Sequence, residues 1–142
     1  MITPFRAAVA AVVAICSIGP NALHAQSYPT KSVTLIVPSA AGGGTDTIAR
    51  LIGDQLSKQL GQGFVVENRT GAGMLVGTTA VAKAAPDGYT LLVGLNGNMT
   101  VNPSLFAKLP YDPIADFVPV AMLATYPFLA VVNNDLPVKS IK

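Results

Sequence analysis

Cysteine and histidine are almost absent from this chain, and tryptophan is missing altogether. The single cysteine, Cys16, and the single histidine, His24, both lie in residues 1–25, a segment that we predict to be removed. Disulfides, thiolate nucleophiles, imidazole bases and Cys/His metal sites need residue types that the remaining residues lack. We therefore expect no metal and no cofactor, and any catalysis would depend on carboxylates, Lys, Tyr or hydroxyl groups.

Charged residues are also few, at 11% of 142 residues, and nine Lys and Arg against seven Asp and Glu give a net charge of +2. No basic patch for nucleic acid follows from this balance, so we expect no nucleic-acid partner. Hydrophobic residues make up 51% of the chain, which excludes a disordered tail or linker. The length allows at most one complete domain.

The first 25 residues have the pattern of a secretion signal. Arg6 provides a positive charge, residues 7–18 form an apolar run, and Ala25 is a small residue at a cleavage point. A membrane-spanning helix needs about 20 apolar residues, so the run is too short for a permanent anchor. Cys16 follows Ile15 rather than the small residue expected before a lipidated cysteine. We predict a signal peptide over residues 1–25 and export to the periplasm.

Strand and helix patterns alternate after the signal. Residues 33–37 are apolar on both faces and β-branched, which is typical of a strand covered on both sides in a parallel sheet. Residues 45–60 place apolar side chains at a helical spacing, and Gly61 stands at the expected C-terminal stop. The helical positions are Ile48, Ile52, Leu56 and Leu60. We further predict strands over 64–66 and 89–95, a helix over 74–85 and a helical turn over 103–107. This order indicates an α/β fold with a parallel sheet.

Two more apolar runs, residues 118–124 and 128–132, also predict buried strands, separated from the earlier elements by an irregular segment over 110–116. Such strands need neighbours and covering helices, yet only ten residues follow Val132. We expect residues 26–126 to form a first, incomplete α/β lobe and residues 127–142 to begin a crossing to a second lobe.

Three polar, glycine-rich connections follow the predicted parallel strands, over residues 39–46, 68–73 and 96–102. Ligands of open parallel sheets bind beyond the carboxyl ends of the strands. Glycine lets backbone approach a ligand, and the first two connections lead into helix N-termini, which attract anions. The candidate ligand-binding residues are Ser39, Ala41, Gly42, Gly43, Gly44, Thr45, Asp46, Gly71, Ala72, Gly73, Asn96, Asn98 and Thr100. Together they predict a cleft for a carboxylate or phosphate.

Each candidate also has a structural interpretation. The glycines can simply permit tight turns, and Thr45 can be the N-cap of the helix. Asp46 can favour the helix dipole and pair with Arg50, four residues on. Arg69 can be a solvated loop arginine, and the polar side chains of residues 96–102 can satisfy their own loop.

Known enzyme motifs are incomplete. No lysine follows the glycines as a phosphate-binding loop requires, and no G-x-S-x-G elbow is present. Gly71, Gly73 and Gly77 come near a dinucleotide fingerprint, but they follow the second predicted strand and lack the acidic partner. We do not expect an enzyme. A nucleotide-binding enzyme fragment and a non-functional remnant that fails to fold remain alternatives.

Several motifs in order resemble the Bug-type, TctC-like solute-binding proteins of tripartite tricarboxylate transporters. The similarity extends from about Tyr28 to Lys142. The matching motifs are YPTK at 28–31, VPSAAGGGTD at 37–46 with Arg50, ENRTGAG at 67–73 with Gly77, APDGYTLL at 85–92, NPSLF at 102–106 and LPYDP at 109–113. Two departures are Thr70, where proline is frequent, and Asn98-Met99, where Thr-His is more usual.

The resemblance implies a periplasmic binding protein of two α/β lobes that captures a small organic acid, such as a di- or tricarboxylate, and presents it to transporter membrane subunits. It implies that residues 39–45 and 71–73 clasp the ligand carboxylate through backbone amides, small polar side chains and ordered water, and that residues 96–102 line the same cleft. Family members are considerably longer, so the resemblance also implies that this chain is a truncated front half.

Overall fold

The computed structural model describes residues 27–127, 129–133 and 135–137. The chain divides into two units, Met1–Thr30 and Lys31–Lys142, and all the helices and strands described below belong to the second. The predicted signal peptide lies outside the described residues. Among the described residues, none of the helices combines the length and hydropathy that a membrane span requires.

The second unit is built on a three-stranded parallel sheet with the order β2-β1-β3. The strands are β1 (Val33–Val37), β2 (Phe64–Asn68) and β3 (Thr90–Leu92). Leu35 of β1 lies opposite Val66 of β2 and Leu91 of β3. The predicted first strand is confirmed, and β2 is two residues longer than predicted. β3 is shorter than predicted, and its three residues are only partly buried.

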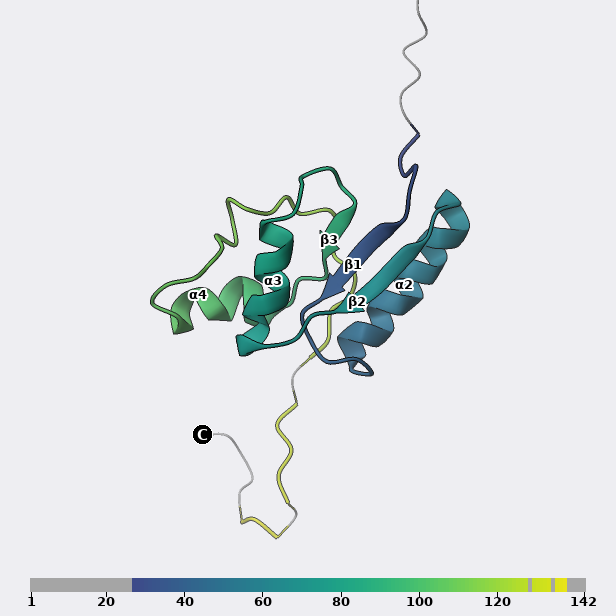
Figure 1. The fold of residues 1–142 in the computed structure, drawn as a ribbon. Coiled ribbons are helices and arrows are strands. Elements are labelled where there is room, and N and C mark those ends of the chain that lie inside the picture. The colour runs from purple at the N-terminus through teal and green to yellow at the C-terminus, as the bar shows by residue number, and fades with distance from the viewer. Residues whose placement is uncertain (1–26, 128, 134, 138–142) are drawn as a thin grey trace, which may run out of the picture. The chain divides into compact units, whose positions relative to one another are not determined.

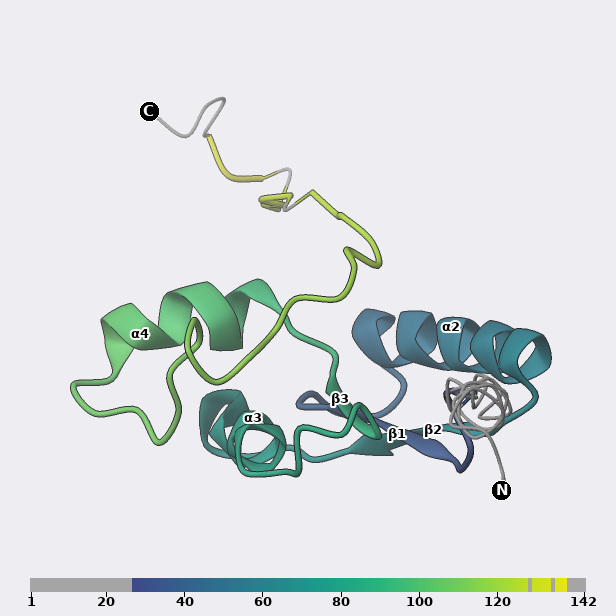
Figure 2. The same cartoon turned by 90° about the horizontal axis from the view of Figure 1, so that it is seen from above.

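Two helices cover opposite faces of the sheet, α2 (Gly44–Leu60) and α3 (Leu75–Ala82) (Figures 1 and 2). The chain runs outward from β1 to β2 and then returns past β1 to β3. Connections of one hand therefore place their helices on opposite faces. The predicted α/β class and parallel sheet are confirmed. The helix predicted over 74–85 ends three residues early, and a 3₁₀ turn, η1 (Ala72–Met74), precedes it.

α2 contacts the sheet through small residues as well as through part of the predicted apolar stripe, because Leu56 packs against the hydrophobic core. Ala49 and Gly53 are buried, whereas Leu60 at the end of the stripe is exposed. A Cβ atom on Gly53 would lie 3.1 Å from the Phe64 carbonyl oxygen, which shows how closely helix and sheet approach. The helix begins one residue earlier than predicted, and its end and the left-handed C-cap at Gly61 (φ 69°) agree with the prediction.

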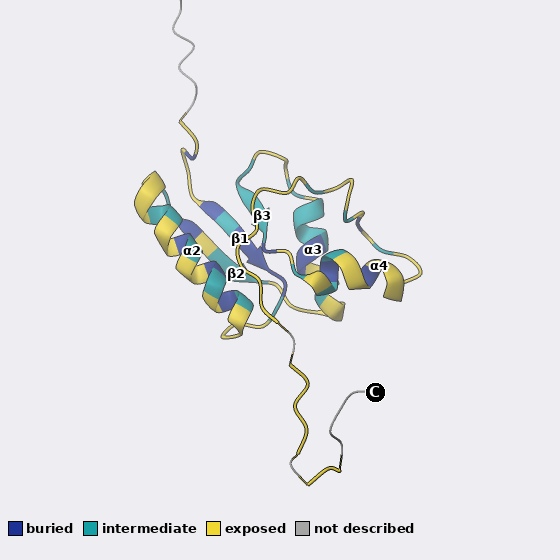
Figure 3. Ribbon diagram, turned by 180° about the vertical axis from the view of Figure 1, so that it is seen from behind, coloured by how far each residue is buried: buried dark blue, intermediate teal, exposed yellow. Residues whose placement is uncertain are grey.

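The hydrophobic core lies between β1 and α2. It contains Val33, Leu35, Val37, Ala49, Phe64 and Val93. Central β1 carries most of this burial (Figure 3) because it has a strand on each side and a helix on each face.

Residues 96–102, predicted as a polar loop, are helical instead. A π-helical turn, η2 (Gly97–Val101), leads directly into α4 (Asn102–Leu105). Asn98 Oδ1 accepts a hydrogen bond of 2.8 Å from the Leu95 N–H, which satisfies backbone at the start of the turn. Polar composition suggested a loop, but here the side chains support the helical backbone.

The strands predicted over residues 118–124 and 128–132 are not formed in the described part of that region, and Phe128 lies outside it. Val118, Val120 and Met122 are each more than 80% exposed. A strand requires a ladder partner for its backbone groups, and neither described edge of the sheet pairs with this segment.

Candidate functional site

The candidate loops leave the carboxyl ends of parallel strands, so they lie at one edge of the sheet (Figure 1). The chain turns in opposite directions after β1 and after β2, which makes the β1/β3 boundary the topological switch point, the usual ligand position in such sheets. The loop before α2 and the backbone leaving β3 therefore lie in the position that the fold favours for binding.

The first loop enters α2 through exposed glycine backbone. Gly42 has a positive φ of 80°, which glycine adopts without steric cost. The N-cap of α2 is Gly43, and none of the described side chains caps it. The prediction that Thr45 is the N-cap is therefore wrong, because the helix already begins at Gly44. An uncapped N-terminus keeps backbone N–H groups and the positive end of the helix dipole available to an anion.

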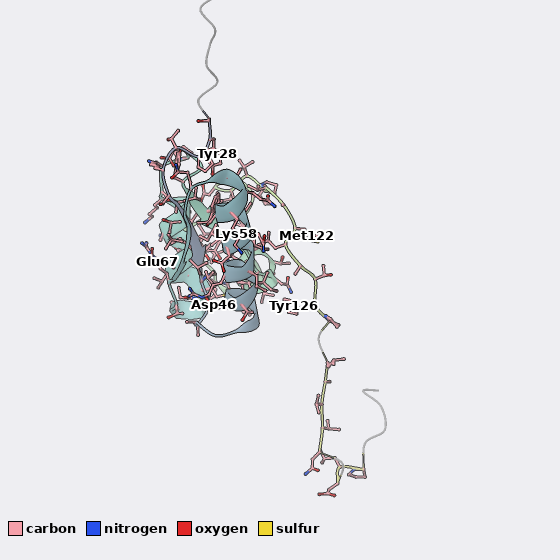
Figure 4. The ribbon with its side chains drawn as sticks, turned by 90° about the vertical axis from the view of Figure 1, so that its right-hand side faces the viewer. Tyr28, Asp46, Lys58, Glu67, Met122 and Tyr126 are labelled. Atoms are coloured by element: carbon pink, nitrogen blue, oxygen red, sulfur yellow. The ribbon has the colours of Figure 1, made fainter. Side chains whose placement is uncertain are left out.

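The carboxylate of Asp46, which is labelled in Figure 4, accepts hydrogen bonds from other groups of the protein. Its side chain is 5% exposed, and it accepts hydrogen bonds from Arg50 Nε at 3.0 Å, the Gly42 N–H at 2.8 Å and Asn68 Nδ2 at 3.0 Å. The hydrogen bond from Arg50, with those from Gly42 and Asn68, lowers the pKa of Asp46 to about 2. This geometry matches the structural interpretation of Asp46 and leaves its carboxylate little capacity for a ligand.

Arg50 and Asn68 join the first loop to the second. Arg50 Nη2 donates to Asn68 Oδ1 at 3.0 Å, and Asn68 Nδ2 also donates to the Ser39 carbonyl at 3.1 Å. Sequence reasoning identified the Asp46–Arg50 spacing but not Asn68, whose long-range contacts leave no local pattern. Arg69 instead forms an exposed ion pair with Glu67 at 2.7 Å, which fits the solvated interpretation.

The second loop has an unusual left-handed course. The φ angles from Gly71 to Met74 are 129°, 46°, 64° and 74° in succession. Gly71 and Gly73 adopt such angles readily, but Ala72 and Met74 do so at a cost of about 1 kcal/mol each. Strain of this kind is often retained at functional sites.

In the third segment, Asn98 is fully buried and both ends of its amide are used. Leu95 N–H donates to its Oδ1, and its Nδ2 donates to Thr78 Oγ1 at 2.8 Å. The side-chain amide of Asn98 is therefore already paired within the protein, and its role in ligand binding stays a prediction. Among the other candidates, nine are exposed, two are half-buried and Asp46 is buried. The half-buried residues are Ser39 and Thr45, and the exposed ones are Ala41, Gly42, Gly43, Gly44, Gly71, Ala72, Gly73, Asn96 and Thr100.

A pocket of about 340 Å³ lies beside the start of α2. Its walls are Thr45 and Ile48 of α2, residues 92–96 at the end of β3, and residues 121–126, which include Met122 and Tyr126 (Figure 4). None of the described lining residues carries a charge. Of the predicted candidates, only Thr45 and Asn96 line this pocket. The sequence analysis missed residues 121–126 because their apolar run indicated a strand. It missed residues 92–95 because it assigned them to the third strand and started the loop at residue 96.

The described residues contain no cluster of three or more His, Cys, Asp or Glu side chains that could hold a metal ion. Asp46 pairs with Arg50 and Glu67 pairs with Arg69, so the remaining polar groups of the three described segments are backbone N–H groups, hydroxyls and side-chain amides. Such a donor set suits a small anion held by neutral groups better than it suits proton-transfer chemistry.

Comparisons with known proteins give a consistent picture. A sequence profile described as "Tripartite tricarboxylate transporter family receptor" matches residues 48–142. Protein BugT of Bordetella pertussis is 42% identical over 120 residues, covering 84% of this chain and 37% of that protein. The chain thus spans less than two fifths of this relative's length.

Solved structures are also similar to this chain in sequence and in fold. MatC from Rhodopseudomonas palustris, solved with bound malate, is 51% identical with a TM-score of 0.65, over 68% of this chain and 33% of that one. Rpa4515 of the same species, solved with adipate, is 43% identical with a TM-score of 0.59, over 61% and 29% of the two chains. On the profile match and these similarities, the chain belongs to the tripartite tricarboxylate transporter receptor family.

Proposed function

We propose that this chain is part of an extracytoplasmic receptor that captures a small organic carboxylate. The observation that carries the proposal is the uncapped N-terminus of α2, which opens beside an apolar pocket at the switch point of the sheet. Support comes from relatives of the same family, because MatC was solved with malate and Rpa4515 with adipate.

In the proposed complex, backbone amides rather than a cationic side chain hold the carboxylate. The Arg50 guanidinium is already paired with Asp46, so these two charges largely cancel near the loop. Gly43 and Gly44 carry no Cβ and let the ligand approach the peptide dipoles closely. Thr45 adds a hydroxyl at the pocket wall.

Ser39 supplies a further polar group. Its Oγ atom is buried and has no hydrogen-bond partner among the described residues. Buried hydroxyls are usually satisfied by protein, water or ligand. We assign this hydroxyl to the carboxylate or to a water molecule that bridges to it, together with the backbone of Gly71 and Gly73 from the second loop.

The cellular setting of the receptor belongs to the same proposal. We infer export to the periplasm through residues 1–25, and delivery of the ligand to transporter membrane subunits. The apolar pattern of residues 1–25 supports the first inference, and membership of this receptor family supports the second. A receptor role requires no bond to be made or broken, and the family is one of receptors rather than enzymes.

Isothermal titration calorimetry of the full chain with malate and adipate tests the proposal. Thr45→Asp places a negative charge beside the uncapped helix end, so we expect it to weaken binding by at least tenfold. Gln55→Asp adds the same charge on an exposed position of α2 away from the loop and should leave the affinity within twofold. Heat with NAD or ATP but with neither acid would instead favour a nucleotide-binding fragment and overturn the proposal.

A further inference from the structure

Two buried side chains donate hydrogen bonds to backbone carbonyl groups of the left-handed loop from Gly71 to Met74. Asn102 Nδ2 donates to the Gly73 carbonyl at 2.8 Å, and Thr78 Oγ1 donates to the Met74 carbonyl at 2.8 Å. Asn102 is 5% exposed and Thr78 is fully buried. Both bonds therefore end on residues whose backbone has an unfavourable or glycine-dependent φ.

Further hydrogen bonds connect the side chains that make these two contacts to Asn98 and Tyr111. Asn98 Nδ2 donates to Thr78 Oγ1, and the Tyr111 hydroxyl donates to the Asn98 carbonyl at 2.5 Å. Asn102 Nδ2 also lies 3.5 Å from the Tyr111 hydroxyl. Side chains from η2, α4 and the turn at Tyr111 thus converge on one loop.

Apolar contacts complete this support. A Cβ atom on Gly73 would lie 3.6 Å from the Phe106 ring, and one on Gly97 would lie 2.9 Å from Met74 Cε. Gly97 therefore admits the Met74 side chain, and Phe106 covers the backbone of Gly73. The segment that follows β3 is shaped around the loop that follows β2.

We propose that Thr78, Asn98, Asn102 and Tyr111 are positioning residues that fix the Gly71–Met74 loop in its ligand-binding course without touching the ligand. The inference rests on the proposed function. Burying polar groups is unfavourable unless each finds a partner, and here the partners are in or next to one strained loop. If only part of the population holds the loop correctly, the apparent affinity falls by that fraction.

Matched variants of Thr78 separate positioning from packing. Thr78→Val keeps the volume but removes the hydroxyl, whereas Thr78→Ser keeps the hydroxyl. A single hydrogen bond of this kind corresponds to about a three- to tenfold change in an equilibrium. We expect Thr78→Val to weaken malate and adipate binding by about that factor and Thr78→Ser to stay within about twofold of the wild type. Tyr111→Phe removes one oxygen atom and should act like Thr78→Val, which keeps the test available if Thr78→Val does not fold.

The second measurement does not depend on any ligand. Amide NMR signals of Gly71 and Gly73 in the unliganded full chain should shift or broaden in Thr78→Val and Tyr111→Phe but not in Thr78→Ser. A purely structural role would lower the melting temperature and leave both the affinities and these signals unchanged, which would overturn the inference. If the wild type binds neither acid, the proposed function fails, and the glycine signals alone still decide whether these residues position the loop.

Discussion

Gly77 in α3 is the position where one methyl group should disturb the fold most clearly. A Cβ atom there would lie 2.6 Å from the Arg69 carbonyl oxygen and 3.0 Å from Pro38 Cβ. The first neighbour is backbone, so it cannot move aside as a flexible side chain would. Gly77 is therefore the close contact that lets α3 pack against the ends of β1 and β2.

The expected cost of Gly77→Ala follows from two opposing effects. Overpacking at a rigid contact costs about 3 kcal/mol, at the upper end of its usual range. Alanine regains about 1 kcal/mol because it favours a helix over glycine. The net loss is about 2 kcal/mol in the free energy of unfolding, or a fall in melting temperature of roughly 10 °C.

Urea and thermal denaturation followed by circular dichroism measure this loss. Gly44→Ala is the matched control, since it makes the same chemical change in a helix where nothing lies within 4 Å of the new Cβ. It should be neutral or slightly stabilising. A Gly77→Ala protein as stable as the wild type would refute the close approach of α3 to Pro38 and the β2–α3 loop.

Two further predictions concern the acid range and the folding of the chain. The pKa of Asp46 is lowered from 3.8 to about 2, mainly by Arg50, so its ionised form favours the folded state above pH 4 and that contribution is lost as the pH falls toward 2. Urea midpoints measured between pH 5 and pH 2 should therefore fall more steeply for the wild type than for Asp46→Asn, and parallel curves would contradict the assignment. The full chain should also show a single cooperative thermal transition at low concentration, because its core joins β1, α2 and β2. A gradual loss of ellipticity would instead support a remnant that does not fold.

The elements that the sequence predicted well are those with a strong local pattern. β1 is rich in apolar and β-branched residues, and α2 ends at Leu60 with Gly61 as its left-handed C-cap, as expected. Of the apolar stripe predicted for α2, Leu56 packs against the core, whereas Leu60 is exposed. Periodicity marks apolar side chains. It does not identify Gly53, whose lack of a side chain allows the contact with Phe64.

The site was harder to predict because its geometry depends on contacts across the sheet edge. Asn68 binds Asp46, Arg50 and the Ser39 carbonyl, which are 18 to 29 residues earlier in the chain. Nothing local to Asn68 signals these partners. Likewise, the polar composition of residues 96–102 predicted a loop that meets the ligand, whereas Asn98 points its amide into the interior. Loop position could be inferred from the sequence, but side-chain direction could not.

The absence of charge among the described pocket-lining residues has a consequence for how such a receptor can diversify. Under the proposed function, main-chain N–H groups bind the carboxylate, whereas side chains such as Ile48 and Met122 contact the rest of the ligand. Exchanging one aliphatic group for another would then alter the preferred nutrient while leaving the anchor intact. Because peptide dipoles are local, added salt should weaken such a grip less than it would weaken a grip by an exposed lysine or arginine.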